Sequence, residues 1–144
     1  MTSLTREEIA QRLAEPRRPS FNGEDLSGLD VRGFDLSGLD LSYVSLMNAD
    51  LRGVNLSGAI LWAADLRQVL ANGANLAGAN LGTANLAGAR LNKAFFGGAS
   101  LLGANLTNAD VSGTDFSGAE LTNAILTDVI SDSGTLWPDS MDRE

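Results

Sequence analysis

The residues best suited to chemistry are four aspartates that recur at every fifth position, Asp25, Asp30, Asp35 and Asp40. Carboxylates gathered on one side of a chain could bind a hard cation such as calcium. Histidine and cysteine are both absent, which removes the Ser–His–Asp and Cys–His arrangements of nucleophilic enzymes. The glycines lack the Lys-Ser/Thr pair of a phosphate-binding loop. The aspartates are therefore the only candidate ligand set. Whether they can bind one cation depends on where the fold places them.

The chain that positions them has a period of five. An apolar residue returns at every fifth position from Phe21 to Leu126, twenty-two times in succession, and only Ala71 is weak. From Leu29 onward, a second small or apolar residue lies two places before each of these. Helices need apolar spacings of three and four and strands need alternation by two, so neither template fits. A fixed repeat predicts a solenoid, whose units bury their inward residues by stacking on one another.

The run GANLAGANLGTANLAGARL, residues 73–91, resembles the pentapeptide-repeat proteins. The resemblance implies an all-β fold, a right-handed quadrilateral parallel β-helix, in which four pentapeptides make one square coil. The central leucine and the residue two before it would point inward. We expect residues 1–20 to be a capping helix and linker, 21–130 the β-helix of about five and a half coils, and 131–144 a tail that closes the last coil.

In such a coil the four aspartates cannot form a metal site. Five residues make a quarter turn, so Asp25, Asp30, Asp35 and Asp40 face four different directions. We expect solvated outward carboxylates, no metal, no cofactor and no catalytic residue.

The N-terminal residues 4–15 predict a short helix. Thr5 and Glu8 form a capping box, and Leu4 and Ile9 are placed as its hydrophobic staple. Pro16 ends the helix. We expect the helix to cover the first coil; the alternative is a helix that binds a partner.

Residues twenty apart should be neighbours on one face, which predicts an outward patch of Tyr43, Ile60 and Trp62, with Leu102 two coils away. Exposed aromatic side chains in one patch are typical protein-interface anchors. Incidental decoration or self-association is the alternative. Beside the weak Ala71, Leu70 could turn inward through a local bulge.

The tail contains Leu136, Trp137 and Pro138 and resembles the short Trp-Pro tails that close many bacterial pentapeptide proteins. Trp137 is expected to lie across the last coil as a lid. The alternative is an end-to-end dimer contact, since some family members pair through their C-terminal coils, so a monomer and a C-terminal homodimer both remain open.

The net charge of −8 is unevenly spread, with +1 in residues 1–20, −6 in 21–130 and −3 in 131–144. No basic stripe favours nucleic-acid binding, and no segment has the apolar length of a signal peptide or a membrane span. We predict a cytoplasmic, non-enzymatic scaffold or protein-interaction module whose partner is a protein of unknown identity. The alternative implied by the resemblance is a DNA mimic that inhibits or protects DNA gyrase or topoisomerase. Between Asp65 and Asp110, however, the chain has no acid and three bases, which a mimic of regularly charged DNA should not have.

Overall fold

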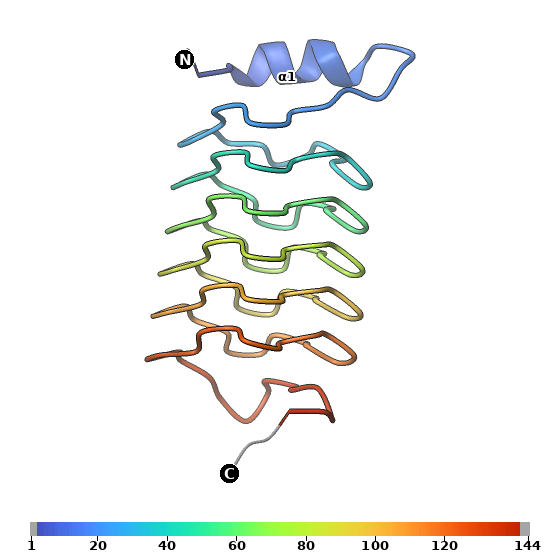
Figure 1. Ribbon diagram of the computed structural model, residues 1–144. Helices are drawn as coiled ribbons and strands as arrows, with labels where there is room; N and C mark the ends of the chain where they lie inside the picture. The colour runs from blue at the N-terminus through green and yellow to red at the C-terminus, as the bar shows by residue number, and fades with distance from the viewer. Residues whose placement is uncertain (1–2, 142–144) are drawn as a thin grey trace.

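The computed structural model describes residues 3–141 as one rod of stacked coils with a single helix across its N-terminal end (Figure 1). Helix α1 spans Arg6–Leu13. Within the described residues, the coils are joined by isolated parallel β-bridges rather than by longer strands, from Ser20 paired with Asp40 to Asp115 paired with Leu136. The fold is the expected four-sided, right-handed parallel β-helix with a short capping helix.

The five-residue period arises because each face of the coil holds one pentapeptide. Bridges join residues twenty apart, such as Asn55 and Asn75, so four pentapeptides complete a turn. Leu56 and Ala59 are both 0% exposed, and the equivalent residues of every inner coil are buried with them. The interior is thus a column of leucine and alanine side chains, tightly filled as protein cores are.

Each corner needs one residue with a positive φ. Gly58 has φ +66° there, a conformation that costs glycine little. Tyr43 and Thr83 have φ values of +60° and +54° at equivalent corners, although a side chain disfavours this conformation. The stacked coils above and below hold these two residues in place.

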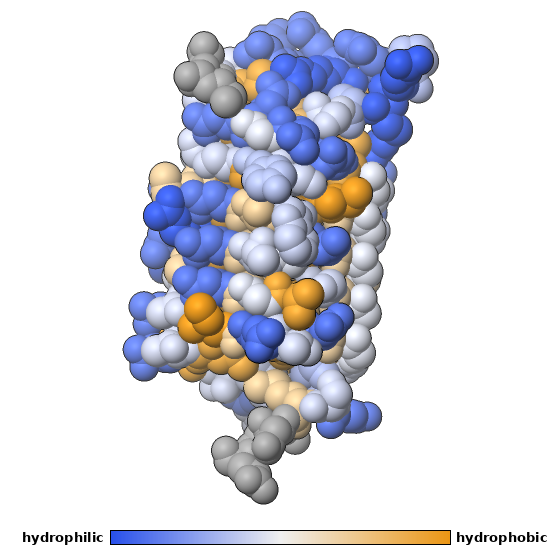
Figure 2. All heavy atoms as spheres, in the orientation of Figure 1, coloured by the Kyte–Doolittle hydropathy of each residue, from blue (hydrophilic) through white to orange (hydrophobic). Residues whose placement is uncertain are grey.

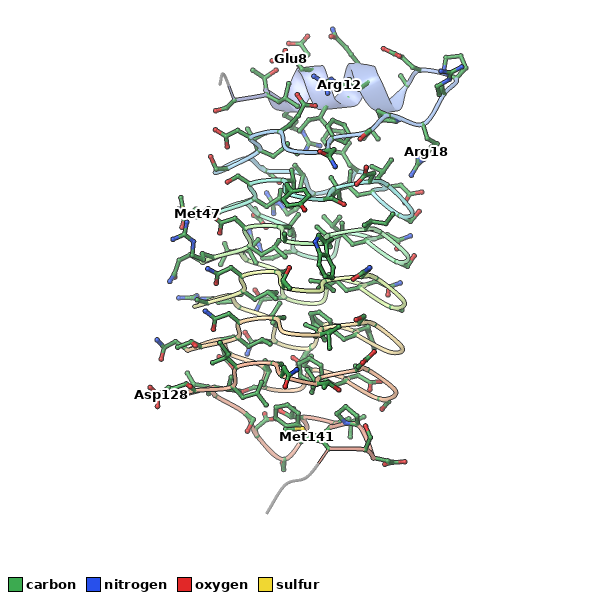
Figure 3. The ribbon with its side chains drawn as sticks, viewed as in Figure 1. Glu8, Arg12, Arg18, Met47, Asp128 and Met141 are labelled. Atoms are coloured by element: carbon green, nitrogen blue, oxygen red, sulfur yellow. The ribbon has the colours of Figure 1, made fainter. Side chains whose placement is uncertain are left out.

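Helix α1 caps the first coil as predicted. The hydroxyl of Thr5 accepts the N–H of Glu8, the Glu8 carboxylate accepts the N–H of Thr5, and both bonds of the capping box are present. Leu4 and Ile9 are buried against the first coil. Arg12, labelled in Figure 3, forms an ion pair with Glu24 of that coil.

The N-terminal segment also supplies hydrogen-bond donors to the upper edge of the first coil. The sequence analysis did not predict these bonds. The backbone N–H of Leu4 donates to the carbonyl of Asp25 at 3.0 Å. The guanidinium of Arg6 donates to the carbonyls of Asp30 and Arg32 at 2.7 and 2.9 Å. Arg18 donates to the carbonyl of Ser37 at 2.5 Å. Four carbonyls that would lack a partner on an open edge are thereby satisfied.

The expectation of a bulge at Leu70 is wrong. Ala71 is buried at 2% exposure, and the backbone of Leu70 keeps its bonds to the coils on both sides, to Ala49 at 3.0 Å and from Leu51 at 2.6 Å. Leu70 stays in the outward position because the unbroken ladder fixes the register. Among residues 3–141, no helix has the length and apolar character needed to cross a membrane.

Candidate functional site

The predicted side-face residues lie on one face, with Tyr43 on one coil, Ile60 and Trp62 on the next and Leu102 two coils beyond Trp62. Tyr43, Ile60, Trp62 and Leu102 are 61%, 42%, 38% and 37% exposed. The N–H of Tyr43 donates to the carbonyl of Trp62 at 2.9 Å, which places these two residues on directly stacked segments. Ile60 is bridged to Asp40 above and to Asn80 below. We call these four residues the side-face patch.

The Trp62 ring extends over Gly82, which lies on the coil between Trp62 and Leu102. A Cβ atom added to Gly82 would lie 2.2 Å from a carbon of the Trp62 ring, so the indole packs against Gly82 of the next coil. The N–H of Thr83 then bonds to the carbonyl of Leu102 one coil further down, at 2.8 Å. Glycine at 82 therefore leaves room for the Trp62 ring on the coil between Trp62 and Leu102.

On the side of the rod in view, Figure 2 shows hydrophobic side chains as separate spots among hydrophilic ones, with a gathering near the last full coil. Other exposed apolar residues, outside the side-face patch, are Phe95, Ile125, Ile130 and Leu136. Phe95, Ile125 and Ile130 are 53%, 47% and 56% exposed. Their common signal is an apolar residue at the corner position that Asp or Asn occupies in most repeats.

The aspartates that lie directly before the central residue of each repeat, here called the corner aspartates, point outward but have a structural role. In the turn at Asp25, the N–H and hydroxyl of Ser27 both donate to one carboxylate oxygen, at 3.0 and 2.6 Å. These two bonds, the hydroxyl first, hold the pKa of Asp25 below its ordinary value. Asn55 accepts the same pair of bonds from Ser57, at 3.0 and 2.7 Å. The need for a side-chain oxygen at the corner explains why Asp and Asn alternate there.

Arginines pair with aspartates along one side of the rod. Arg32 bonds Asp30 at 2.9 Å and reaches Asp50 of the next coil at 3.3 Å, and Arg52 bonds Asp50 at 2.7 Å. The Arg32 side chain is the main cause of the lowered pKa of Asp30, and the Arg52 side chain has the same effect on Asp50. Such exposed pairs contribute little to stability.

Trp137 and Leu136 occupy different environments. The ladder slips by one residue in the tail, since Asp115 pairs with Leu136 instead of residue 135. Trp137 thereby reaches an inward position and is half-buried, whereas Leu136 points outward and is 52% exposed. The carboxylate of Asp132 accepts the N–H of Gly113 at 3.0 Å, where a backbone carbonyl serves in the regular coils.

No group of three or more potential metal-ligating residues converges within residues 3–141. A cavity of about 380 Å³ lies at the C-terminal end of the rod, lined in part by Leu121, Leu126, Pro138 and Met141. Met141 is labelled below the last coil in Figure 3. The described residues thus offer contact surfaces and backbone edges.

A sequence model described as pentapeptide repeats matches the chain in 8 copies, over residues 21–58, 49–86, 79–118 and 99–130. The chain belongs to the pentapeptide-repeat family. A comparison with curated proteins finds no match.

Solved structures of other pentapeptide-repeat proteins agree with this fold. One from the thylakoid lumen of Arabidopsis thaliana is 32% identical, with a TM-score of 0.66, and the match covers 68% of each chain. One from Nostoc PCC 7120 is 33% identical with a TM-score of 0.53, over 61% of this chain and 77% of that one. Full-length QnrB1, a plasmid-mediated fluoroquinolone resistance protein, is 18% identical with a TM-score of 0.34, over 79% of this chain and 82% of that one. At that distance the likeness to QnrB1 carries no functional argument.

Proposed function

We propose that this pentapeptide-repeat protein is a rigid, non-enzymatic module that binds a protein partner through the side-face patch. The observation that carries the proposal is the exposed Trp62 ring, which occupies the space beside Gly82, the residue that separates Trp62 from Leu102 in the stack. Tyrosine and tryptophan in a continuous patch are the residues that most often anchor protein interfaces.

The rigidity of the rod favours binding by this patch. Trp62 is held against a backbone that is hydrogen-bonded to the coils above and below, so its side chain loses little freedom when a partner covers it. Preorganised aromatic contacts of this kind raise affinity because less ordering is needed on association.

A non-enzymatic role is supported by the residues available. Histidine and cysteine are absent from the sequence, and the corner aspartates are engaged in turn hydrogen bonds or in pairs with arginine. We propose a cytoplasmic location. The sequence has no cysteine, so the fold contains no disulfide that would need an oxidising compartment to form.

The test is capture of a partner from lysate by immobilised protein, with Trp62→Ser beside the unaltered chain. Phe95→Ser is the matched control, because Phe95 is also an exposed aromatic residue but lies outside the patch. We expect Trp62→Ser to fold normally and lose the partner, and Phe95→Ser to keep it. Equal capture by both variants would refute the patch as the binding surface.

The DNA-mimic alternative has less support. The chain has no acid between Asp65 and Asp110, and the pairing of Arg67 with Asp65 at 2.7 Å reduces the negative charge at one boundary of that span. A DNA mimic needs negative charge along its whole length. A DNA gyrase supercoiling assay at two salt concentrations separates the two functions: salt-sensitive inhibition at low micromolar protein would favour the mimic, and no inhibition the binding module.

A further inference from the structure

Within residues 3–141, the last coil leaves a row of backbone N–H groups without a hydrogen-bond partner. In the coil above, four N–H groups donate to carbonyls of the last coil at 2.8–3.0 Å: Leu101 to Glu120, Gly103 to Thr122, Leu106 to Ile125 and Asn108 to Thr127. The equivalent groups twenty residues on belong to Leu121, Asn123, Leu126 and Asp128, and none has a hydrogen-bond acceptor within residues 3–141. The tail covers other faces of this coil, so two faces, residues 121–130, keep an open edge.

The two ends of the rod are therefore treated differently. At the N-terminal end, Leu4, Arg6 and Arg18 satisfy the carbonyls of the first coil. At the C-terminal end, the open edge has donors where the covered edge had acceptors. An unpaired row of this kind is a template for another extended chain.

The interior beside this open edge is only partly covered, since Pro138 and Met141 of the tail line the same cavity as Leu121 and Leu126. Four inward residues of the last coil are only partly buried: Leu121, Ala124, Leu126 and Val129. Their equivalents one coil earlier are all 0% exposed: Leu101, Ala104, Leu106 and Ala109. The cavity of about 380 Å³ adjoins Leu121 and Leu126. Apolar side chains of an added segment would find contacts there in the same positions that the next coil would supply.

The charge around the open edge indicates the chemistry of the segment. No lysine or arginine occurs from residue 94 to residue 141, whereas six acids do. Glu120, Asp128 and Asp139 are exposed near this end, and Figure 3 shows Asp128 projecting outward from a corner of the last full coil. A basic segment would be attracted and an acidic one repelled.

We propose that the open edge at residues 121–130 binds an extended, basic segment of a partner protein, which adds to the rod as a further β-layer. The site is separate from the side-face patch and does not depend on it. Carbonyls of the segment accept from the four N–H groups, its apolar side chains cover Leu121, Leu126 and Val129, and its basic side chains face the acidic rim.

A second copy of this chain fits the same edge poorly. The edge offers four donors but only two inward-lying acceptors, the carbonyls of Ala124 and Val129, whose counterparts Ala104 and Ala109 accept from Ile125 and Ile130. A symmetric pair of such edges has too few acceptors for its donors. It also brings two acidic rims together.

The probe is a fluorescein-labelled ten-residue peptide, Ala-Arg-Leu-Ser-Gly repeated twice, titrated against the full chain by fluorescence anisotropy. We expect saturable binding that weakens as salt rises, and no binding of the peptide with glutamate in place of arginine. Equal binding of both peptides, or no binding of the basic one, would overturn the proposal.

Hydrogen exchange locates the bound peptide without any mutation. The amides of Leu121, Asn123, Leu126 and Asp128 should exchange rapidly in the free protein and slow down when the basic peptide is present. Protection elsewhere but not at these amides would place the peptide on another surface and overturn the proposal. Slow exchange without peptide, together with a dimer in sedimentation, would mean that a second copy occupies the edge and would equally overturn it.

A matched pair of variants tests the contact. Val129→Lys places a cation among the half-buried residues of the end, and Thr127→Lys adds the same charge at an exposed position of the same coil. We expect Val129→Lys to weaken peptide binding by about tenfold or more and Thr127→Lys to weaken it far less, with the far-UV circular dichroism of both unchanged. Equal affinities would refute the site. Trp62→Ser should bind the peptide normally, so failure of the side-face patch and failure of this site are distinguishable.

Discussion

The ring of Trp137 stacks on that of Phe116, with centroids 5.2 Å apart and planes inclined by 10°. Phe116 in turn stacks on Phe96 at 5.1 Å, one coil above. Trp137 is thus the last member of an aromatic column inside the rod. It reaches that place because the tail carries one extra residue relative to the repeat.

Trp137→Ala should lower the free energy of unfolding by about 2 kcal/mol, because the substitution removes a half-buried aromatic contact from the end of the column. Urea unfolding followed by circular dichroism measures the change. Leu136→Ser is the control, since Leu136 points outward and its loss should have little effect. Equal midpoints for Trp137→Ala and the unaltered protein would show that the column does not need its last ring.

Gly82→Ala should displace the Trp62 ring, because the new Cβ would lie 2.2 Å from it. The ring can swing into solvent, so stability should change by less than about 1 kcal/mol. In a Trp137→Phe background, Trp62 is the only tryptophan, and its emission should move to longer wavelength. Gly97→Ala is the matched control because its Cβ would be 3.7 Å from the nearest atom. An unshifted spectrum for Gly82→Ala would contradict the placement of the indole.

Arg6→Ala should destabilise the N-terminal end, since the carbonyls of Asp30 and Arg32 lose their donors. The guanidinium also lies 4.2 Å from the centre of the Phe34 ring, and this contact is lost too. We expect a cost of about 1 kcal/mol, measured by urea unfolding. Arg17→Ala, at an exposed position, provides the control. If both substitutions cost the same, the Arg6 contacts add nothing to stability.

Stability should fall in acid. Serine side chains, and then serine N–H groups, hold the pKa values of Asp25, Asp35 and Asp115 below the ordinary value in the folded chain. Groups with lowered pKa values stabilise the fold above about pH 4, and this contribution disappears as the pH falls through their folded pKa values. Melting temperatures from pH 7 to pH 2 should show the loss.

The triple variant with asparagine at these three positions should show a smaller loss in acid. Its amide oxygens keep the hydrogen-bond acceptor, as Asn55 does naturally, but they do not titrate. If the melting temperature of the triple variant falls between pH 7 and pH 2 as much as that of the unaltered protein, other groups cause the loss.

The period of five predicted a solenoid, and the resemblance to the family implied the square coil and its inward residues. The capping box was predicted separately, from the spacing of Thr5 and Glu8, because it is a local sequence pattern. The corner role of Asp25 could have been inferred from its exchange with asparagine in other repeats. The reach of Arg6 over the first coil and the one-residue slip before Trp137 could not, since both depend on where the chain lies after it leaves the repeat. The boundaries at residues 20 and 130 remain a proposal, and bridges at Ser20 and Leu136 show that flanking residues also join the ladder.

The bridges that join residues twenty apart have a consequence for insertions and deletions. Removing twenty residues from the middle of the rod would shorten it by one layer and leave every column of surface side chains in line. Removing five would turn everything downstream by a quarter revolution, so that Leu102 would no longer lie below Trp62. Length changes in whole coils should therefore preserve a binding face, whereas shorter ones should scramble it even where the core remains sound.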